Sequence, residues 1–274
     1  MTERALVSAH EIAAAIGQFP PTPEQRAVIE SPLEPALVVA GAGSGKTETM
    51  AARVLWLLAN DLVRPTEILG LTFTRKAAGE LAERIRTRID QLERAGLMAA
   101  PGDPFDVPAV STYNAYANAL FRDNAAVLGR EADGAVLGEA AAWQLARRVV
   151  LASRDERLPG LDRGVEAVTG AVLNVARALA ENVADPEAVR DYARELQSVL
   201  ELPSTAQYPA VVKAVTDVGA LDVLLDLAAD LDELKRRRGL VEFSDQVALG
   251  LEIVRRRPEI ADAEKASYRV VLLD

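Results

Sequence analysis

The chain has 274 residues, half of them apolar, and a net charge of −10 at neutral pH. A chain of this length and hydrophobicity can build one large domain or two ordinary ones, which excludes a disordered protein. The absence of cysteine excludes disulfide bonds and thiolate metal sites. The negative charge argues against a protein that coats nucleic acid with a basic surface, but it does not exclude a local strand-binding groove.

Membrane and targeting segments are not expected. The longest apolar runs, such as VLWLLA at residues 54–59, are much shorter than the roughly 20 residues that cross a bilayer. The N-terminal stretch carries acidic residues and has no sustained apolar core, which is atypical of a secretory signal. We therefore expect a cytoplasmic protein with no membrane partner.

The first third of the chain alternates short apolar runs with helical stretches. Three runs have the length and composition of buried strands: residues 36–40, 68–73 and 108–112. A helix is predicted over residues 46–60, and Thr74 is placed to cap a second long helix. Strands separated by helices predict an α/β fold with a parallel sheet and helical crossovers.

From about residue 115 the pattern changes to alanine- and leucine-rich helical spacing, and strand-like apolar runs return only at the very end. We therefore expect three segments: a first part of the α/β core at residues 1–114, a helical insertion at 115–239, and a return to the core at 240–274. The closing VVLLD reads as a buried strand that ends on a carboxylate, so we expect the domain to be cut off there.

A glycine-rich loop lies between the first predicted strand and helix. Its sequence, AGAGSGKT, ends in the Gly-Lys-Thr of a P-loop but has alanine at the first position. Three glycines let the backbone turn its N–H groups toward an anion, and the following helix directs its positive end there. The predicted phosphate-binding residues are Ala40, Gly41, Ala42, Gly43, Ser44, Gly45, Lys46 and Thr47.

Within this loop, Lys46 is expected to neutralise the β- and γ-phosphates, and the Thr47 hydroxyl to ligate Mg²⁺. The loop taken alone also fits a kinase or a GTPase. The segments on either side of it argue against those classes.

The flanking segments resemble the UvrD/Rep/PcrA and RecB group of superfamily 1 DNA helicases. The matching stretches occur in the family's order: PPTPEQRAVIESP, AGAGSGKT, ILGLTFTRKAAGEL, VSTYNAYA, VEFSDQVAL and VVLLD. In that group the P-loop usually begins with alanine, which accounts for Ala40. The resemblance implies a RecA-like P-loop core with an inserted helical subdomain, and ATP and Mg²⁺ as cofactors.

The resemblance assigns Gln25 to the adenine edge, where a carboxamide can donate and accept at once. A second interpretation stays open, because Thr22, Pro23 and Gln25 also form a helix-capping box with proline at the first helical position. Glu48 replaces a frequent arginine of the family, so a guanidinium contact with the nucleotide at that position is lost.

Single-stranded DNA is the partner that the resemblance implies, through residues that stack on bases or bond phosphate. These are Phe73, Thr74, Arg75, Thr112 and Tyr113. An aromatic ring can stack on any base, which suits a protein that does not read sequence. The alternative is that Phe73 only ends a buried strand and Thr74 only caps a helix. Asn114 replaces a common histidine, which puts that contact in doubt.

Asp274 matches the Walker B carboxylate, so the resemblance makes Lys46 and Asp274 the catalytic residues present and Thr47 and Asp274 the metal ligands. The glutamate that activates water and the second RecA-like lobe follow this segment in the family. We therefore expect residues 1–274 to bind nucleotide weakly and to hydrolyse almost none.

Two basic runs, KRRRG at residues 235–239 and RRRP at 255–258, have the composition of nucleic-acid patches. Both also stand where a helix is expected to end, where cations complement the helix dipole. We favour the helix-end interpretation for both.

Taken together, the sequence predicts the N-terminal part of an ATP-dependent DNA helicase that moves 3′ to 5′ on single strands in DNA repair or recombination. Its substrates would be single-stranded DNA and duplex/single-strand junctions, and its second lobe would be supplied in cis. The segments FTRKAAGEL and STYNAYA are closest to helicase–nuclease subunits of the AdnAB type, which resect double-strand breaks with a partner subunit. A stand-alone repair helicase and a non-motor P-loop scaffold subunit are the alternatives.

Overall fold

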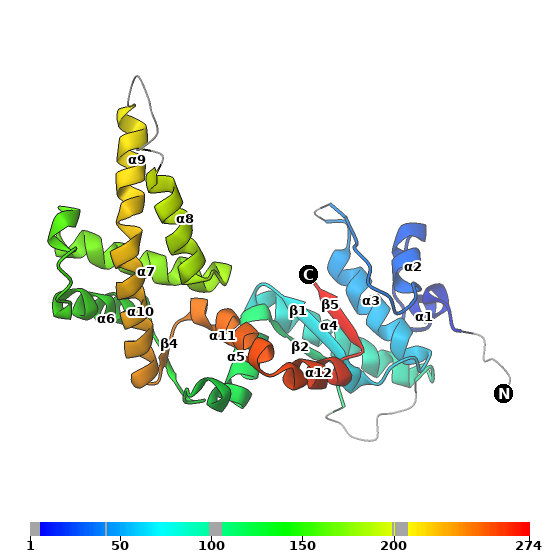
Figure 1. Cartoon of the computed structure of the whole chain (residues 1–274). Coiled ribbons are helices and arrows are strands. Elements are labelled where there is room, and N and C mark those ends of the chain that lie inside the picture. The colour runs from blue at the N-terminus through cyan, green and yellow to red at the C-terminus, as the bar shows by residue number, and fades with distance from the viewer. Residues whose placement is uncertain (1–5, 42, 99–105, 199, 201–207) are drawn as a thin grey trace. The chain divides into compact units, whose positions relative to one another are not determined.

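The computed structural model describes residues 6–41, 43–98, 106–198, 200 and 208–274 (Figure 1). The chain divides into two compact units. We call Met1–Tyr116 with Pro258–Asp274 the sheet unit, and Ala117–Arg257 the helical unit. Each is described by itself.

The sheet unit is built on three parallel strands in the order β2-β1-β5, with bounds Ala109–Thr112, Ile68–Thr72 and Val270–Leu273. The central strand β1 is buried along its whole length. β5 is an edge strand among the described residues, and Val271 and Leu273 on it are 49% and 64% exposed. Two of the three predicted strands are therefore confirmed, together with the predicted strand at the end of the chain.

Helices pack around this sheet: α1 (Ala9–Ala15), α2 (Pro23–Ile29), α3 (Lys46–Ala59), α4 (Arg75–Arg94) and α12 (Pro258–Ser267). The first turn of α5 (Tyr113–Asn124) and the short 3₁₀ helix η1 (Pro65–Glu67) also belong to this unit. One apolar core joins α1, α2, α3 and α4 to β1 and β5, and Trp56 is buried in it. As predicted, α4 begins after Thr74, whose hydroxyl accepts a hydrogen bond from the Ala77 N–H at 3.1 Å.

A buried arginine joins α3 to α2. The Arg53 guanidinium donates to the main-chain carbonyls of Val28, Ile29, Ser31 and Pro32 at 2.9–3.1 Å. These carbonyls lie at and just beyond the C-terminal end of α2, where a helix leaves carbonyls without partners. Burial lowers the pKa of Arg53. The contact fixes α2, and with it Gln25, on the helix that follows the P-loop.

The strand predicted over residues 36–40 is wrong for this structure. The segment is irregular and exposed, and both Leu37 and Val39 are 89% exposed. An apolar β-branched run specifies burial, but a strand also needs a neighbouring edge to take its backbone N–H and C=O groups. No described strand pairs with these residues.

The helical unit consists of the rest of α5 followed by α6 (Glu139–Ala152), α7 (Val165–Asn182), α8 (Pro186–Ser198), α9 (Pro209–Gly219), α10 (Leu221–Arg237) and α11 (Phe243–Arg256). Its core is formed by α6, α7 and α10. Two-residue strands, β3 (Ala135–Val136) and β4 (Leu240–Val241), pair in parallel. The 3₁₀ helices η2 (Ala125–Leu128) and η3 (Pro159–Leu161) complete the unit.

The sheet unit resumes at Pro258, whereas the sequence suggested residue 240. The residues in between stay with the helical unit because β4 pairs with β3 and α11 packs on α7. Both basic runs are confirmed as helix ends, since Arg236 and Arg237 lie in the last turn of α10 and Arg256 in that of α11.

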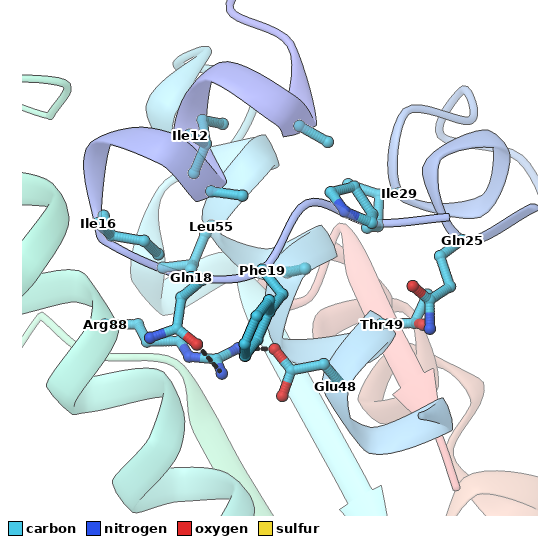
Figure 2. Close-up of a pocket in the computed structure, with 14 residues that line it drawn as sticks. Ile12, Ile16, Gln18, Phe19, Gln25, Ile29, Glu48, Thr49, Leu55 and Arg88 are labelled. Atoms are coloured by element: carbon cyan, nitrogen blue, oxygen red, sulfur yellow. Dashed lines mark hydrogen bonds and ion pairs between the residues drawn. The ribbon is translucent and has the colours of Figure 1, made fainter. Parts of the chain in front are cut away.

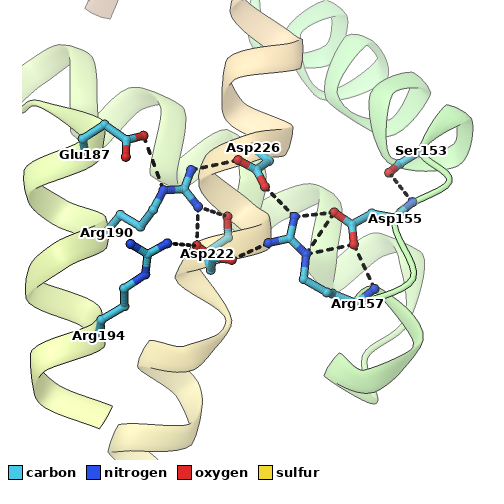
Figure 3. A network of polar contacts seen from close by, with 8 residues as sticks. All are labelled: Ser153, Asp155, Arg157, Glu187, Arg190, Arg194, Asp222 and Asp226. Carbon is cyan, nitrogen blue, oxygen red and sulfur yellow. Dashed lines mark hydrogen bonds and ion pairs between the residues drawn. The ribbon is translucent and has the colours of Figure 1, made fainter. Parts of the chain in front are cut away.

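A network of arginines and aspartates ties α8 to α10 and to the loop after α6 (Figure 3). Asp222 and Asp226, one turn apart on α10, lie between Arg157 of that loop and Arg190 of α8. Arg157 also pairs with Asp155 at 2.5 Å. Ala193 is the one residue of α8 that is buried among those described, so these ion pairs add to the packing of α8 on α9 and α10.

No helix in the described part of the chain is long and apolar enough to cross a membrane.

Candidate nucleotide and DNA site

The loop before α3 is exposed, and its backbone requires glycine at two positions. Gly43 and Gly45 have φ angles of 76° and 84°, in the left-handed region. A Cβ on Gly45 would lie 2.9 Å from Nε2 of Gln25, so this position is also closely approached. Gly45 is the N-cap of α3 and carries no side chain to cap it, which leaves the N–H groups of the first turn directed at the loop. Ala42 lies outside the described residues.

Lys46 folds back over this loop. Its ammonium donates to the main-chain oxygens of Ala40 at 3.1 Å and Gly41 at 2.9 Å, while the side chain stays exposed. The Ser44 hydroxyl donates to the same Gly41 oxygen at 2.8 Å. Thr47 is half-buried in the first turn of α3. A cation, free helix N–H groups and glycine-dependent turns together form the donor set that a triphosphate requires, so the residues present fit this group.

Gln25 lies against the same loop. The predicted capping box is formed: the Thr22 N–H donates to Oε1 of Gln25 at 3.0 Å, and the Gln25 N–H donates to the Thr22 hydroxyl at 3.3 Å. Nε2 of Gln25 donates to the Ser44 carbonyl at 3.2 Å. These bonds use one amide hydrogen and one lone pair, and leave one of each for a ligand. The cap and a base contact are therefore compatible.

A pocket opens beside Gln25, between α1, α2, α3 and α4 (Figure 2). Ile12, Ile29 and Leu55 supply apolar walls, and Phe19 lies at its mouth with 95% of its surface exposed. The pocket adjoins the first turns of α3 through Glu48 and Thr49.

Glu48 is neutralised in this pocket by arginines of α4, a feature that sequence reasoning missed. Arg88 Nη1 lies 2.5 Å and Arg84 Nη1 lies 3.4 Å from the Glu48 carboxylate oxygens. Arg88 also donates to Oε1 of Gln18 at 3.3 Å. The spacing of Arg84 and Arg88, one helical turn apart, was the available signal, but the sequence does not show that this face of α4 meets α3. A guanidinium therefore lines the pocket although position 48 is acidic.

The carboxyl end of the sheet carries an aromatic pair, of which Phe73 is exposed and Tyr113 half-buried. Phe73 follows β1 and is 81% exposed, and Tyr113 follows β2. Their ring centroids are 5.0 Å apart, at an angle of 51° between the planes. Arg75 and Lys76 are exposed in the first turn of α4 next to this pair. Stacking surface and positive charge thus occur together, as single-strand binding requires.

The two threonines predicted to contact DNA have local roles. Thr112 is buried, and its hydroxyl accepts a hydrogen bond from the Ala115 N–H at 3.1 Å. The Thr74 hydroxyl caps α4. The structure thus shows the cap that the alternative gave for Thr74, and it shows Phe73 exposed beyond the end of β1. Contact of Phe73, Thr74 and Thr112 with DNA stays a prediction.

Asp274 extends the sheet by one step beyond β5. Its N–H donates to the Leu71 carbonyl at 3.0 Å, and its main-chain oxygen accepts a hydrogen bond from the Tyr113 hydroxyl at 3.2 Å. The structure thus brings Phe73, Tyr113 and Asp274 together at one edge, and Gln25, Ser44 and Lys46 together at the phosphate loop. The shared Mg²⁺ site of Thr47 and Asp274 stays a prediction.

Comparison with known proteins agrees with this geometry. The UvrD/REP helicase N-terminal domain matches residues 21–274. The chain therefore belongs to the UvrD/REP helicase N-terminal domain family.

Individual proteins that are similar to this chain are named as DNA helicases. The chain is 24% identical over 251 residues to the ATP-dependent DNA helicase PcrA of Staphylococcus aureus (strain Mu50 / ATCC 700699), covering 92% of this chain and 29% of that protein. It is 50% identical over 76 residues to DNA helicase IV of Escherichia coli (strain K12), covering 23% of this chain and 11% of the relative. It is 48% identical over 63 residues to the ATP-dependent DNA helicase UvrD1 of Mycobacterium leprae (strain TN). The chain thus spans less than a third of the length of PcrA.

Proposed function

We propose that the chain is the first RecA-like lobe of an ATP-dependent DNA helicase that moves 3′ to 5′ along single-stranded DNA. The observation that carries this proposal is the loop before α3. Two of its glycines, Gly43 and Gly45, have left-handed backbone angles, and the Lys46 ammonium folds back onto the loop's main-chain oxygens. Membership of the UvrD/REP family and the DNA helicase names of the relatives support the same activity.

In this proposal the loop N–H groups and Lys46 hold the phosphates of ATP, and Thr47 with Asp274 holds Mg²⁺. The bound ATP supplies the free energy of hydrolysis, and the metal neutralises charge on the phosphates. Gln25 has one amide hydrogen and one lone pair available for the adenine edge, and the neighbouring pocket offers apolar walls for a base. The Glu48–Arg88 pair keeps the acidic side chain from repelling the nucleotide.

DNA would bind at the carboxyl end of the sheet. Phe73 and Tyr113 offer ring faces that stack on bases of any sequence, and Arg75 adds charge for the phosphates. Thr74 and Thr112 position these residues through their caps. Single strands and junctions with duplex are the expected substrates.

Hydrolysis would need groups beyond those that the sheet unit provides. In the family a second RecA-like lobe closes on the nucleotide, and a glutamate after the Walker B aspartate activates water. We therefore propose that residues 1–274 on their own bind ATP weakly and hydrolyse almost none.

The test uses the complete gene product and its Lys46→Ala variant. We expect ATP hydrolysis stimulated by oligo(dT) and unwinding of a 3′-tailed duplex, both of which the variant loses. Unchanged unwinding by the variant would contradict the motor and favour a scaffold subunit whose P-loop serves assembly alone. A wild-type protein that hydrolyses ATP without regard to DNA would contradict the DNA assignment.

The cellular role is proposed at a finer level from sequence resemblance. FTRKAAGEL and STYNAYA favour a subunit of a double-strand-break-resecting helicase–nuclease of the AdnAB type, acting with a partner subunit. A stand-alone repair helicase is the alternative. Nuclease activity of the purified complete protein on linear duplex ends, in the presence of ATP, separates the two.

A further inference from the structure

Tyr113 occupies an unusual place among the three strand ends. The strand order is β2-β1-β5, so β2 and β5 are not neighbours. Tyr113 begins α5 directly after β2, yet its hydroxyl donates to the main-chain oxygen of Asp274, directly after β5. The side chain therefore crosses the end of β1.

The residue that Tyr113 passes on the way is Phe73. Thr72 and Thr112 are register partners, so Phe73 and Tyr113 stand at matched positions one step beyond them. Their rings contact at a centroid distance of 5.0 Å. On the other side of β1, Leu71 and Leu273 are partners, which places Asp274 opposite Thr72. The Tyr113 side chain thus contacts the exposed Phe73 ring and also the main chain of Asp274, which is the expected metal ligand.

We propose that Tyr113 is a positioning residue that couples DNA binding at Phe73 to the placement of Asp274. This inference rests on the proposed function, because it gives the aromatic pair a DNA base and the Asp274 carboxylate a Mg²⁺ ion. A base stacked on the pair fixes the Tyr113 ring, and the ring's hydroxyl then holds the main chain of Asp274 in place. The hydroxyl is essential for this role, whereas stacking requires only the ring.

The effect of removing the Tyr113 hydroxyl is limited, because Asp274 has a second hydrogen bond to the sheet. The Asp274 N–H donates to the Leu71 carbonyl at 3.0 Å, a bond in which Tyr113 takes no part, so we expect β5 to stay in register when the hydroxyl is removed. One hydrogen bond of ordinary net strength changes an equilibrium about two- to tenfold. We therefore expect a loss of coupling within this range, and not a loss of fold.

The test is Tyr113→Phe in the complete gene product, which keeps the ring and removes the hydroxyl. The affinity for a fluorescent oligo(dT), measured by anisotropy, is expected to stay within about twofold, because the stacking face is retained. The kcat of DNA-stimulated ATP hydrolysis is expected to fall about two- to tenfold, and the Mg²⁺ concentration for half-maximal rate to rise. Such a split between affinity and kcat would not follow from a generally weakened fold.

Tyr116→Phe is the matched control, because that tyrosine lies one turn later on α5 and bonds Glu264 on α12 instead. It is expected to leave the affinity, the kcat and the Mg²⁺ dependence as in the wild type. Tyr113→Leu, which removes ring and hydroxyl, should weaken DNA binding as well.

Two results would overturn the coupling. The first is a Tyr113→Phe variant with wild-type stimulation and Mg²⁺ dependence. The second is a variant whose DNA affinity and kcat fall in parallel, which would make the hydroxyl a plain part of the DNA contact. A wild-type protein without DNA-stimulated hydrolysis would overturn the proposed function and this inference together, so the two failures are distinguishable.

Discussion

Lys235 and Asp245 form an ion pair inside the helical unit, with the Lys235 ammonium 2.9 and 2.7 Å from the two Asp245 carboxylate oxygens. The Lys235 side chain is 3% exposed. Glu242 lies 3.4 Å from the same ammonium and also accepts two hydrogen bonds from Arg177 of α7. The cluster therefore joins the ends of α10 and α7 to the start of α11.

Replacing Lys235 by methionine is expected to destabilise the protein by about 3–5 kcal/mol, since it leaves the buried Asp245 carboxylate without its cation, whereas Glu242 keeps Arg177. Urea unfolding followed by circular dichroism measures this change. The matched control is Arg236→Met, one position later, whose partner Glu233 is on the surface; it should cost less than about 1 kcal/mol. Equal decreases in the free energy of unfolding would show that the buried ion pair contributes no more to stability than the surface ion pair.

The phosphate loop gives a prediction that separates backbone strain from side-chain crowding. Alanine at Gly43 or Gly45 must adopt a positive φ, which costs about 1–2 kcal/mol. Only at Gly45 does the added Cβ also approach Gln25 Nε2 at 2.9 Å, whereas nothing lies within 4 Å at Gly43. Gly45→Ala should therefore weaken binding of a fluorescent ATP analogue more than Gly43→Ala. Equal affinities would contradict this prediction and would show that the Gln25 amide gives way to the added methyl group.

Phe73 offers a direct test of the DNA surface. Phe73→Leu keeps an apolar side chain but removes the stacking face, so affinity for oligo(dT) should fall by about 1–3 kcal/mol. Phe243→Leu, at another exposed phenylalanine, lies in the helical unit and is expected to bind oligo(dT) as the wild type does. Anisotropy titrations at one fixed salt concentration compare the three proteins. A Phe73→Leu protein with wild-type affinity would exclude stacking at this edge.

The network in Figure 3 predicts an acid-sensitive contact. The hydrogen bonds from Arg157 hold the pKa of Asp155 at about 2, below its ordinary 3.8, and those from Arg157 and Arg190 also lower the pKa of Asp226. A carboxylate whose pKa is lowered by folding stabilises the folded state at pH values above its ordinary pKa of 3.8. This contribution to stability disappears as the pH falls through the folded-state pKa of about 2. NMR titration of Asp155 should show its pKa rising toward 3.8 in Arg157→Gln.

Arg194→Gln is the control for that titration, since Arg194 lies 3.7 Å from Asp222 and has no contact with Asp155 among the described interactions. Its Asp155 should titrate as in the wild type. If Asp155 titrates near 3.8 in the wild type, Arg157 does not engage it in solution.

Local signals predicted the parts of the fold that depend on neighbours in sequence. The strand at residues 68–72 followed from its short apolar run, and the start of α4 followed from Thr74, because a cap needs only the next turn. The Thr22–Gln25 box was recognisable for the same reason. The partners in these interactions are only three or four residues apart, so a short stretch of sequence shows both of them.

Interactions between distant segments were not predictable in this way. Residues 36–40 have a strand's composition, but composition does not name the edge on which a strand pairs. Lys235 was expected only as a helix-end cation, because the sequence does not show that β4 turns Asp245 back toward it. Arg88 was missed since its partner, Glu48, is forty residues away on another helix.

The outer edge of β5 has a practical consequence for work with the purified 274-residue chain. Its backbone groups on that side have no strand partner among the described residues, and the neighbouring Val271 and Leu273 face solvent. A strand edge that has no strand partner can serve as a template for a strand from another molecule. A 274-residue polypeptide should therefore self-associate as its concentration rises, and fusing it to a covering domain should keep it monomeric.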